Sequence, residues 1–166
     1  VGGVRLLNML RKEFIGLHLN EGHCTFALLE LLHQGWTREE LSKKILFTTH
    51  TPVPAGHDRF DWADVNEVLG DLMPDDVVEL VKSVGDPEDG ARCSMSHLAV
   101  ALAEQVNAVS NLNAQVASTM FDNNHIHPRT NGVHHITWTS PTMAELFDEK
   151  LSGWTQDPTQ LGDAGT

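Results

Sequence analysis

Two short polar segments carry most of the chemically versatile side chains of this chain. The first, residues 20–23, contains Asn20, Glu21 and His23, which supply an amide, a carboxylate and an imidazole. The second places His50 among three threonines. Side chains of these types suit multidentate hydrogen bonding to a polyol, because sugar hydroxyls need donors and acceptors in a fixed array. The alternative interpretation is that these residues only cap helices and form turns, with no ligand.

Each polar segment follows a predicted strand. The mostly apolar residues 14–19 precede the first segment, which leads into an apolar helix at 25–34. A second strand is predicted at 45–49, and it ends at His50. In parallel α/β sheets, ligands bind at the carboxyl ends of the strands. We therefore expect both polar segments to face one crevice.

The rest of the chain alternates between helical and strand periodicity, which predicts an α/β fold. Neither an internal repeat nor a linker is evident, so we expect residues 1–166 to form one α/β segment. The chain opens within a plausible element at 4–10 and stops without a closing element, so we expect this segment to be incomplete and cut from a longer protein. The other expected helices lie at 2–11, at 37–40 where a capping box opens one, at 61–83 as two acidic helices broken at Pro74, and at 141–150. Residues 94–120 have helical periodicity with a short strand near 106–109. Between these elements we expect an irregular Pro- and Gly-rich loop at 51–58, a surface loop at 86–90 and a polar stretch at 123–138.

Composition and charge exclude several classes of protein. The chain has 166 residues, of which 40% are hydrophobic and 20% charged, as in globular proteins. Its net charge of −12 argues against a nucleic-acid partner or an anionic membrane surface. No apolar run approaches the roughly 18–20 residues of a membrane span. With two cysteines, too few for a disulfide framework, and no secretion leader, we expect a cytoplasmic location.

Metal and nucleophile chemistry are weaker interpretations of the same sequence. The pairs His125/His127 and His134/His135 lack the i, i+4 spacing of a helical zinc site, and no Cys-x-x-Cys motif accompanies them, so we expect no metal site. Cys24 begins an apolar helix, where a small packed residue is expected rather than a nucleophile. The chain contains neither a Gly-x-Ser-x-Gly motif nor a dinucleotide fingerprint.

Five ordered blocks of sequence resemble the α-glucan (glycogen, starch and maltodextrin) phosphorylases, in their short bacterial and archaeal branch. The main blocks are HLNEGH at residues 18–23 and FTTHTPVPAGHD at 47–58. The Gly-Gly-Val-Arg start at 2–5, the helix and strand at 94–110 and the Thr-Asn-Gly-Val turn with its downstream tryptophan at 130–138 agree in order. The resemblance spans essentially the whole chain.

This resemblance implies a fold and roles for particular residues. The fold would be GT-B, with two Rossmann-like domains, and the chain would form mainly the C-terminal part of the first. By this resemblance, Glu21 and His23 would line the glucosyl pocket, with Asn20 in the same turn. The residue at His50 would contact the 6-hydroxyl region of the sugar over the scissile bond, as the catalytic residue of this chain. Asn131 would bind the same glucose.

Two departures from the family pattern matter. Asn111 and Asn113 stand where the family has a lysine and a histidine, which puts the role of that helix start in doubt. The family also uses pyridoxal phosphate, whose Schiff-base lysine lies in the second half of the family's chain. Nothing here resembles that segment, so we expect no cofactor-binding residue in this chain and no activity of the chain alone.

The full-length parent is expected to cleave α-1,4-glucans or maltooligosaccharides with inorganic phosphate, releasing glucose 1-phosphate. The resemblance also implies a family with allosteric members, and it leaves a homo-oligomer open. Three alternatives remain: a non-catalytic glucan-binding remnant of a GT-B domain, a GT-B glycosyltransferase that uses a nucleotide sugar, and a histidine-based metal protein. Without the other strands and the second domain, the isolated chain would expose apolar surface.

Overall fold

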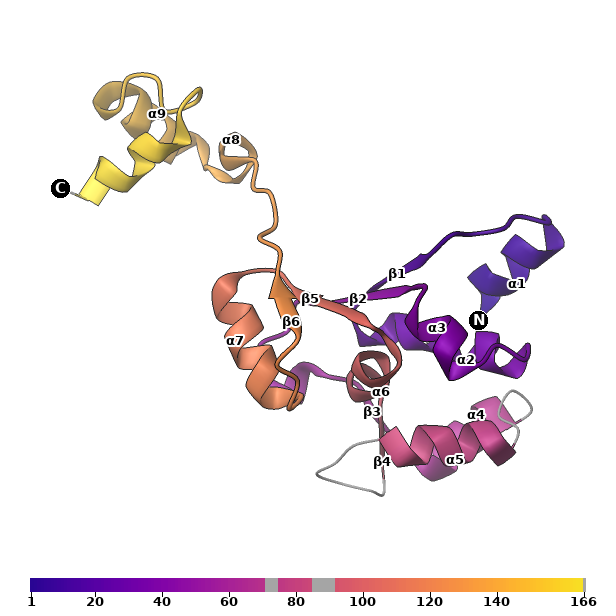
Figure 1. Ribbon diagram of the computed structural model, residues 1–166. Coiled ribbons are helices and arrows are strands. Elements are labelled where there is room, and N and C mark those ends of the chain that lie inside the picture. Colours follow the sequence, from indigo (N-terminus) through magenta and orange to yellow (C-terminus); the bar gives the residue numbers. More distant parts are fainter. Residues whose placement is uncertain (71–74, 85–91, 166) are drawn as a thin grey trace. The chain divides into compact units, whose positions relative to one another are not determined.

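The computed structural model describes residues 1–70, 75–84 and 92–165 (Figure 1). Two compact units divide the chain, the first comprising Val1–Thr130 and the second Asn131–Thr166. The expected break at Pro74 and the expected loop at 86–90 lie outside the described residues.

A four-stranded parallel sheet forms the centre of the first unit. Its strands are β1 (Leu17–Asn20), β2 (Ile45–Thr49), β5 (Gln105–Ala108) and β6 (Ile126–Pro128), in the spatial order β1-β2-β5-β6. All three pairings are parallel. The α/β prediction is confirmed, and the strand at 45–49 has its predicted bounds. The first strand begins three residues later than predicted, and β6 was not predicted at all.

Apolar helices pack on one face of this sheet. The helices α2 (Phe26–His33) and α6 (Met95–Leu102) are each buried along most of their length. Their leucines join the inward-facing strand residues Leu19, Phe47 and Val106 in one core. Burying nearly a whole helix requires apolar residues all round it, which is why neither helix shows the polar stripe of a surface helix.

Other helices also belong to the first unit. They are α1 (Gly2–Met9), the 3-10 helix η1 (Gly22–Thr25), α3 (Arg38–Ser42) and α7 (Asn111–Met120). The predicted capping box opens α3: the Thr37 hydroxyl accepts from the Glu40 N–H, and the Glu40 carboxylate accepts from the Thr37 N–H. The predicted helices at 2–11 and 25–34 are confirmed with shorter bounds.

A two-stranded antiparallel pair, which the sequence did not predict, also belongs to the first unit. It consists of β3 (Arg59–Asp61) and β4 (Arg92–Ser94), and α4 (Trp62–Leu69) and α5 (Asp75–Val84) lie between them in the chain. The two predicted acidic helices are thus confirmed. The expectation that residues 51–58 lack regular structure was wrong in part, because Pro54–Gly56 form the 3-10 turn η2. Proline fits the first turn of a helix, where its missing N–H is not needed.

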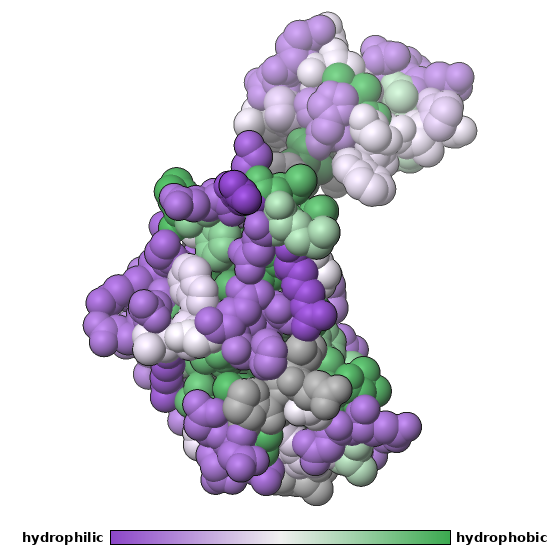
Figure 2. Space-filling model, turned by 90° about the vertical axis from the view of Figure 1, so that its right-hand side faces the viewer, coloured by the Kyte–Doolittle hydropathy of each residue, from purple (hydrophilic) through white to green (hydrophobic). Residues whose placement is uncertain are grey.

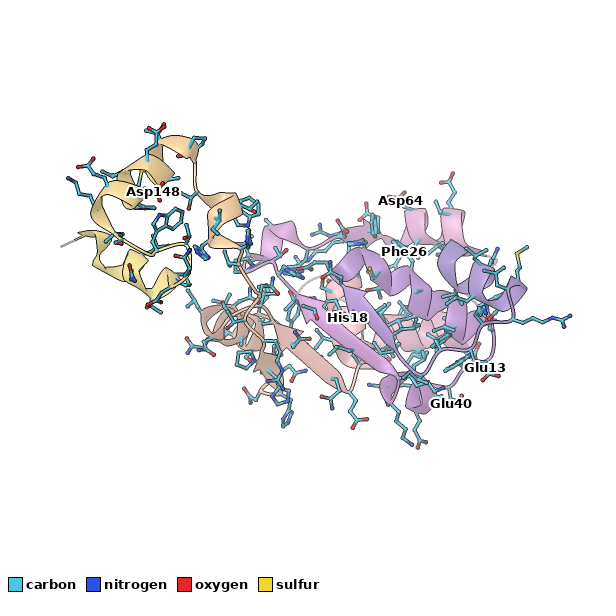
Figure 3. All side chains as sticks on the ribbon, turned by 90° about the horizontal axis from the view of Figure 1, so that it is seen from above. Glu13, His18, Phe26, Glu40, Asp64 and Asp148 are labelled. Carbon is cyan, nitrogen blue, oxygen red and sulfur yellow. The ribbon has the colours of Figure 1, made fainter. Side chains whose placement is uncertain are left out.

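The opposite face of the sheet carries polar side chains. His18, Thr48 and Asn107 lie on three adjacent strands, where His18 Nε2 lies 2.7 Å from Thr48 Oγ1 and Thr48 donates to Asn107 Oδ1 at 2.8 Å. His18 is labelled on β1 in Figure 3. A shallow pocket of about 440 Å³ runs along this face, lined in addition by His127 and Arg129.

The second unit contains α8 (His135–Trp138), α9 (Pro141–Lys150) and the 3-10 helix η4 (Pro158–Gly165). The helix predicted at 141–150 is confirmed, whereas α8 lies in the stretch predicted to be merely polar. Trp154 is its buried centre: the indole N–H donates to Asp148 Oδ1 at 2.9 Å, and the Phe147 ring packs edge-on against it. Exposed apolar side chains remain, among them Trp138 and Val133, and hydrophobic patches are visible on the surface in Figure 2.

Candidate functional site

The two polar segments predicted from the sequence meet at the carboxyl edge of the parallel sheet. Asn20, the last residue of β1, is in register with Thr48 of β2. Two residues further on, His50 leaves the sheet, and its Nε2 lies 2.6 Å from Asn20 Oδ1. Adjacent parallel strands end at the same edge, so the side chains that follow them converge. The prediction that both segments face one place is confirmed for Asn20, Glu21 and His50.

Glu21 is the centre of this arrangement. Its Oε1 atom accepts hydrogen bonds from the Thr51 N–H at 2.9 Å, from the Thr51 hydroxyl at 3.2 Å and from the His50 N–H. The Glu21 backbone has a φ of 70°, a left-handed conformation that is uncommon for residues other than glycine. Such strain persists only where surrounding contacts fix it, and it is concentrated at functional sites.

A pocket of about 200 Å³ opens beside these residues. Its lining combines the first polar turn, the loop after β2 and the start of α6: Glu21, Gly22, His23, Thr51, Gly56, His57, Asp58 and Ser96. His23 is exposed at the pocket, as expected of a ligand-facing residue. Gly22 is buried, and a Cβ atom there would lie 2.6 Å from Ser96 Oγ, so only glycine allows the turn to approach α6 this closely.

Two residues that were not predicted to belong to the site, Asn113 and His57, are hydrogen-bonded to its loop residues His50 and Thr51. The Asn113 side-chain amide donates to the His50 carbonyl at 3.2 Å from the first turn of α7. The His57 ring is 7% exposed and contacts Ser96 and Thr51 through its two nitrogens. The sequence did mark His57 as a candidate, because it belongs to the block at 47–58 that resembles the family. Its burial could not be predicted, because a proline-rich loop has no periodicity that would indicate it.

Asn131, the remaining predicted site residue, is the first residue of the second unit, where it is exposed. It is therefore not among the residues that the first unit brings together. Its assignment to the glucosyl site stays a prediction.

The histidine pairs considered as metal ligands lie apart from this site in the sequence and have other surroundings. His125 and His127 are exposed, His134 Nδ1 lies 2.6 Å from Thr137 Oγ1, and the His135 ring packs edge-on against Trp154. Within residues 1–70, 75–84 and 92–165, no three His, Cys, Asp or Glu side chains are grouped to hold a metal ion.

The two cysteines are placed as packed residues. The Cys24 thiol donates to the Asn20 carbonyl at 3.3 Å, behind the polar turn. Cys93 is fully buried in β4, and this burial raises the pKa of its thiol to about 11. A thiol with so high a pKa stays protonated near neutrality and is a poor nucleophile.

The part of the chain that the structure describes contains no helix with the length and apolar character needed to cross a membrane.

Comparison with known proteins relates the chain to one group of enzymes. It is 32% identical to the maltodextrin phosphorylase of Thermococcus litoralis over 97% of its own length, 33% identical to the glycogen phosphorylase of Mycobacterium tuberculosis over 80%, and 32% identical to that of Aquifex aeolicus over 90%. The chain spans about a fifth of the length of these relatives, between 18% and 24%.

No family profile matches the chain. The relatives nevertheless agree in being named glycogen or maltodextrin phosphorylases, and their similarity extends over 80% to 97% of the chain. The chain therefore belongs to the glycogen and maltodextrin phosphorylase family.

Proposed function

We propose that this chain forms the glucosyl-binding part of a larger α-glucan phosphorylase. Such an enzyme transfers the terminal glucosyl unit of an α-1,4-glucan to inorganic phosphate: the bond from C1 to the glucan oxygen breaks, a bond from C1 to a phosphate oxygen forms, and the leaving oxygen takes up a proton. The observation that carries this proposal is the convergence of Asn20, Glu21 and His50 at the carboxyl edge of the sheet. The names of the relatives supply the reaction class.

His50 is set up to accept a hydrogen bond from a sugar hydroxyl. The Asn20 side-chain carbonyl can only accept, so His50 Nε2 must carry the proton in their 2.6 Å contact. In the neutral ring, Nδ1 then bears the lone pair. The Asn113 amide holds the His50 backbone carbonyl from the other side. A fixed acceptor of this kind contributes to catalysis by holding the glucosyl unit in one orientation.

Glu21 is suited to bind the same sugar. Its three hydrogen bonds to residues that the structure describes all go to Oε1, and its other oxygen, Oε2, would accept from a ligand hydroxyl in the pocket. A carboxylate that is already held by two backbone N–H groups needs little reorganisation when the ligand arrives. We assign Asn20, Glu21 and His23 to glucosyl binding, His50 to catalysis, and Asn131 to the same site in the complete enzyme.

The residues of this chain do not fit pyridoxal phosphate, the cofactor implied by the family. Every lysine is exposed. Lys43 and Lys150 pair with neighbouring glutamates, and Lys44 lies over the Phe14 and Trp36 rings. A Schiff-base lysine instead needs a pocket that lowers its pKa. We therefore propose that the cofactor and the phosphate are held by the remaining four fifths of the enzyme.

The proposal extends to the setting of the complete enzyme. The parallel sheet with its crossover helices is consistent with the first Rossmann-like domain of a GT-B fold. The second domain would come from the rest of the protein. We further propose a cytoplasmic enzyme that acts on α-1,4-glucans or maltooligosaccharides and inorganic phosphate, as the family resemblance implies.

The test uses the full-length protein that contains this chain. Purified with pyridoxal phosphate, it should release glucose 1-phosphate from maltoheptaose and inorganic phosphate. His50→Ala should lower kcat/KM by about a hundredfold, because the glucosyl unit loses its fixed orientation. His125→Asn, an exposed histidine of the same unit, is the matched control and should keep full activity.

Two other results have distinct meanings. A wild-type protein that binds maltoheptaose but releases no glucose 1-phosphate would contradict the proposal and favour the glucan-binding remnant. A His50→Ala variant as active as the wild type would contradict the assignment of the site.

A further inference from the structure

His57 is buried and hydrogen-bonded at both ring nitrogens. Its Nδ1 lies 2.8 Å from Ser96 Oγ, and its Nε2 lies 3.1 Å from the Thr51 carbonyl oxygen. The side chain is 7% exposed, and Ser96 is 1% exposed. Resting on the proposed function, we propose that His57 is a positioning residue for the glucosyl site, which acts through Thr51 on Glu21 and His50.

The partners of His57 determine its tautomer. A backbone carbonyl only accepts, so Nε2 must donate to Thr51. In the neutral ring, Nδ1 is then the acceptor, and the Ser96 hydroxyl donates to it. The imidazole therefore accepts a hydrogen bond from Ser96 at the start of α6 and donates one to Thr51 in the loop after β2.

Thr51 connects His57 to the candidate site. Its carbonyl is held by His57, while its N–H and its hydroxyl both donate to Glu21 Oε1. The same carboxylate oxygen accepts from the His50 N–H. The backbone N–H, the hydroxyl and the carbonyl of Thr51 thus all serve to join His57 to Glu21, and His50 is joined through the same Glu21 oxygen. A shift of Thr51 must move the carboxylate or break its hydrogen bonds.

The surroundings of His57 leave little room for it to move. The Phe121 ring packs edge-on against it, with the ring centroids 5.3 Å apart. Gly56, the preceding residue, has no space for a side chain, since a Cβ atom there would lie 2.5 Å from Thr51 Cγ2. The Met95 N–H donates to the Asp58 carbonyl at 3.1 Å and ties the far end of the loop to α6. The loop is therefore fixed to α6 at His57 and at Asp58.

Two substitutions in the full-length enzyme separate positioning from packing. A glutamine at position 57 reaches as far as Nε2 and can still donate to the Thr51 carbonyl, whereas an asparagine reaches only the Nδ1 side. We expect His57→Asn to lower kcat/KM for maltoheptaose about tenfold or more, because the buried carbonyl loses its donor. His57→Gln should stay within about threefold of the wild type. Both variants lose the aromatic edge contact with Phe121, so their melting temperatures should fall together.

His97→Gln is the matched control. The His97 ring packs edge-on against the same Phe121 ring at 5.0 Å, but its Nδ1 is hydrogen-bonded to Ser94 Oγ. This variant should lower the melting temperature and leave kcat/KM unchanged. Equal losses of kcat/KM in His57→Asn and His57→Gln, tracking their melting temperatures, would overturn the inference, because they would show a packing role alone.

An active wild type with an equally active His57→Asn would also overturn the inference, while leaving the proposed function intact. A wild type that releases no glucose 1-phosphate would instead overturn the proposed function, and this inference with it.

Discussion

The Thr51 backbone N–H and the Thr51 hydroxyl donate to one and the same oxygen of Glu21, at 2.9 and 3.2 Å. This pairing joins the turn after β1 to the loop after β2, which are 30 residues apart in the chain. It also accounts for the left-handed backbone of Glu21, whose φ is 70°. Hydrogen bonds to a charged acceptor contribute more than those between neutral groups, and they offset the cost of that conformation.

Replacing Glu21 by glutamine should therefore lower the activity of the full-length enzyme without abolishing it. The amide oxygen can accept the same hydrogen bonds, but without the charge they lose roughly 1–2 kcal/mol, which corresponds to about a tenfold lower kcat/KM in the full-length enzyme. Steady-state phosphorolysis with maltoheptaose measures this change. Glu13→Gln, an exposed glutamate in the connection before β1, is the control (Figure 3). Unchanged activity in Glu21→Gln would show that the carboxylate charge is not used.

Asn113 gives a second prediction, since its side-chain amide donates to the His50 carbonyl at 3.2 Å. Asn113→Ala removes this donor and should lower kcat/KM about fivefold, the usual effect of losing one neutral hydrogen bond. The matched control is Asn111→Ala, because Asn111 is exposed on the same helix turn. If Asn113→Ala and Asn111→Ala have equal kcat/KM values, Asn113 has no role in holding His50.

Gly22 predicts a steric effect on stability. An alanine there would bring its Cβ within 2.6 Å of Ser96 Oγ and 3.3 Å of the Ser96 backbone N. We expect Gly22→Ala to destabilise the protein by about 1–3 kcal/mol, as overpacking of a buried position does. Gly70→Ala is the control, because no atom of the described residues lies within 4 Å of a Cβ built there. Thermal unfolding monitored by circular dichroism compares the two, and equal melting temperatures would contradict the packing described for this turn.

Glu30 gives a prediction for the pH dependence of stability. It is a buried carboxylate of α2, and the hydrogen bond from Arg5 Nε at 3.0 Å lowers its pKa, against the burial that would raise it. Its contribution to stability is complete above the pKa of the unfolded chain. As the pH falls below roughly 4 to 5, the unfolded state takes up the proton first and this contribution is lost.

Arg5→Gln removes the cation and leaves burial to dominate, so the pKa of Glu30 should then rise. The variant should be less stable than the wild type near neutrality, and the two should converge in acid. Urea unfolding at a series of pH values measures both curves. A difference in stability that does not change with pH would show that the Arg5–Glu30 contact carries no net charge effect.

The elements predicted correctly from the sequence are those with a local signal. The β-branched and aromatic run at 45–49 is bounded by polar residues, and the capping box at 37–40 specifies its own hydrogen bonds. The convergence of Asn20 and His50 could also be predicted, because it depends only on both strands being parallel and ending at one edge.

What was missed depends on contacts between distant residues. The strands β3 and β4 have three residues each, and Phe60 pairs with Cys93 across 33 positions of the chain, so neither strand has a pattern of its own. His57 is similar: its burial comes from Ser96 and Phe121, which are contributed by α6 and the end of α7. Such tertiary contacts leave no local periodicity in a loop.

The central claim is that this chain supplies the glucosyl site of an α-glucan phosphorylase, and one measurement tests it most directly. The full-length protein, with pyridoxal phosphate, is incubated with maltoheptaose and inorganic phosphate, and glucose 1-phosphate is measured for the wild type, His50→Ala and His125→Asn. We expect release by the wild type and the His125 variant and about a hundredfold lower kcat/KM for His50→Ala. No release by the wild type, or equal activity in all three proteins, would contradict the claim.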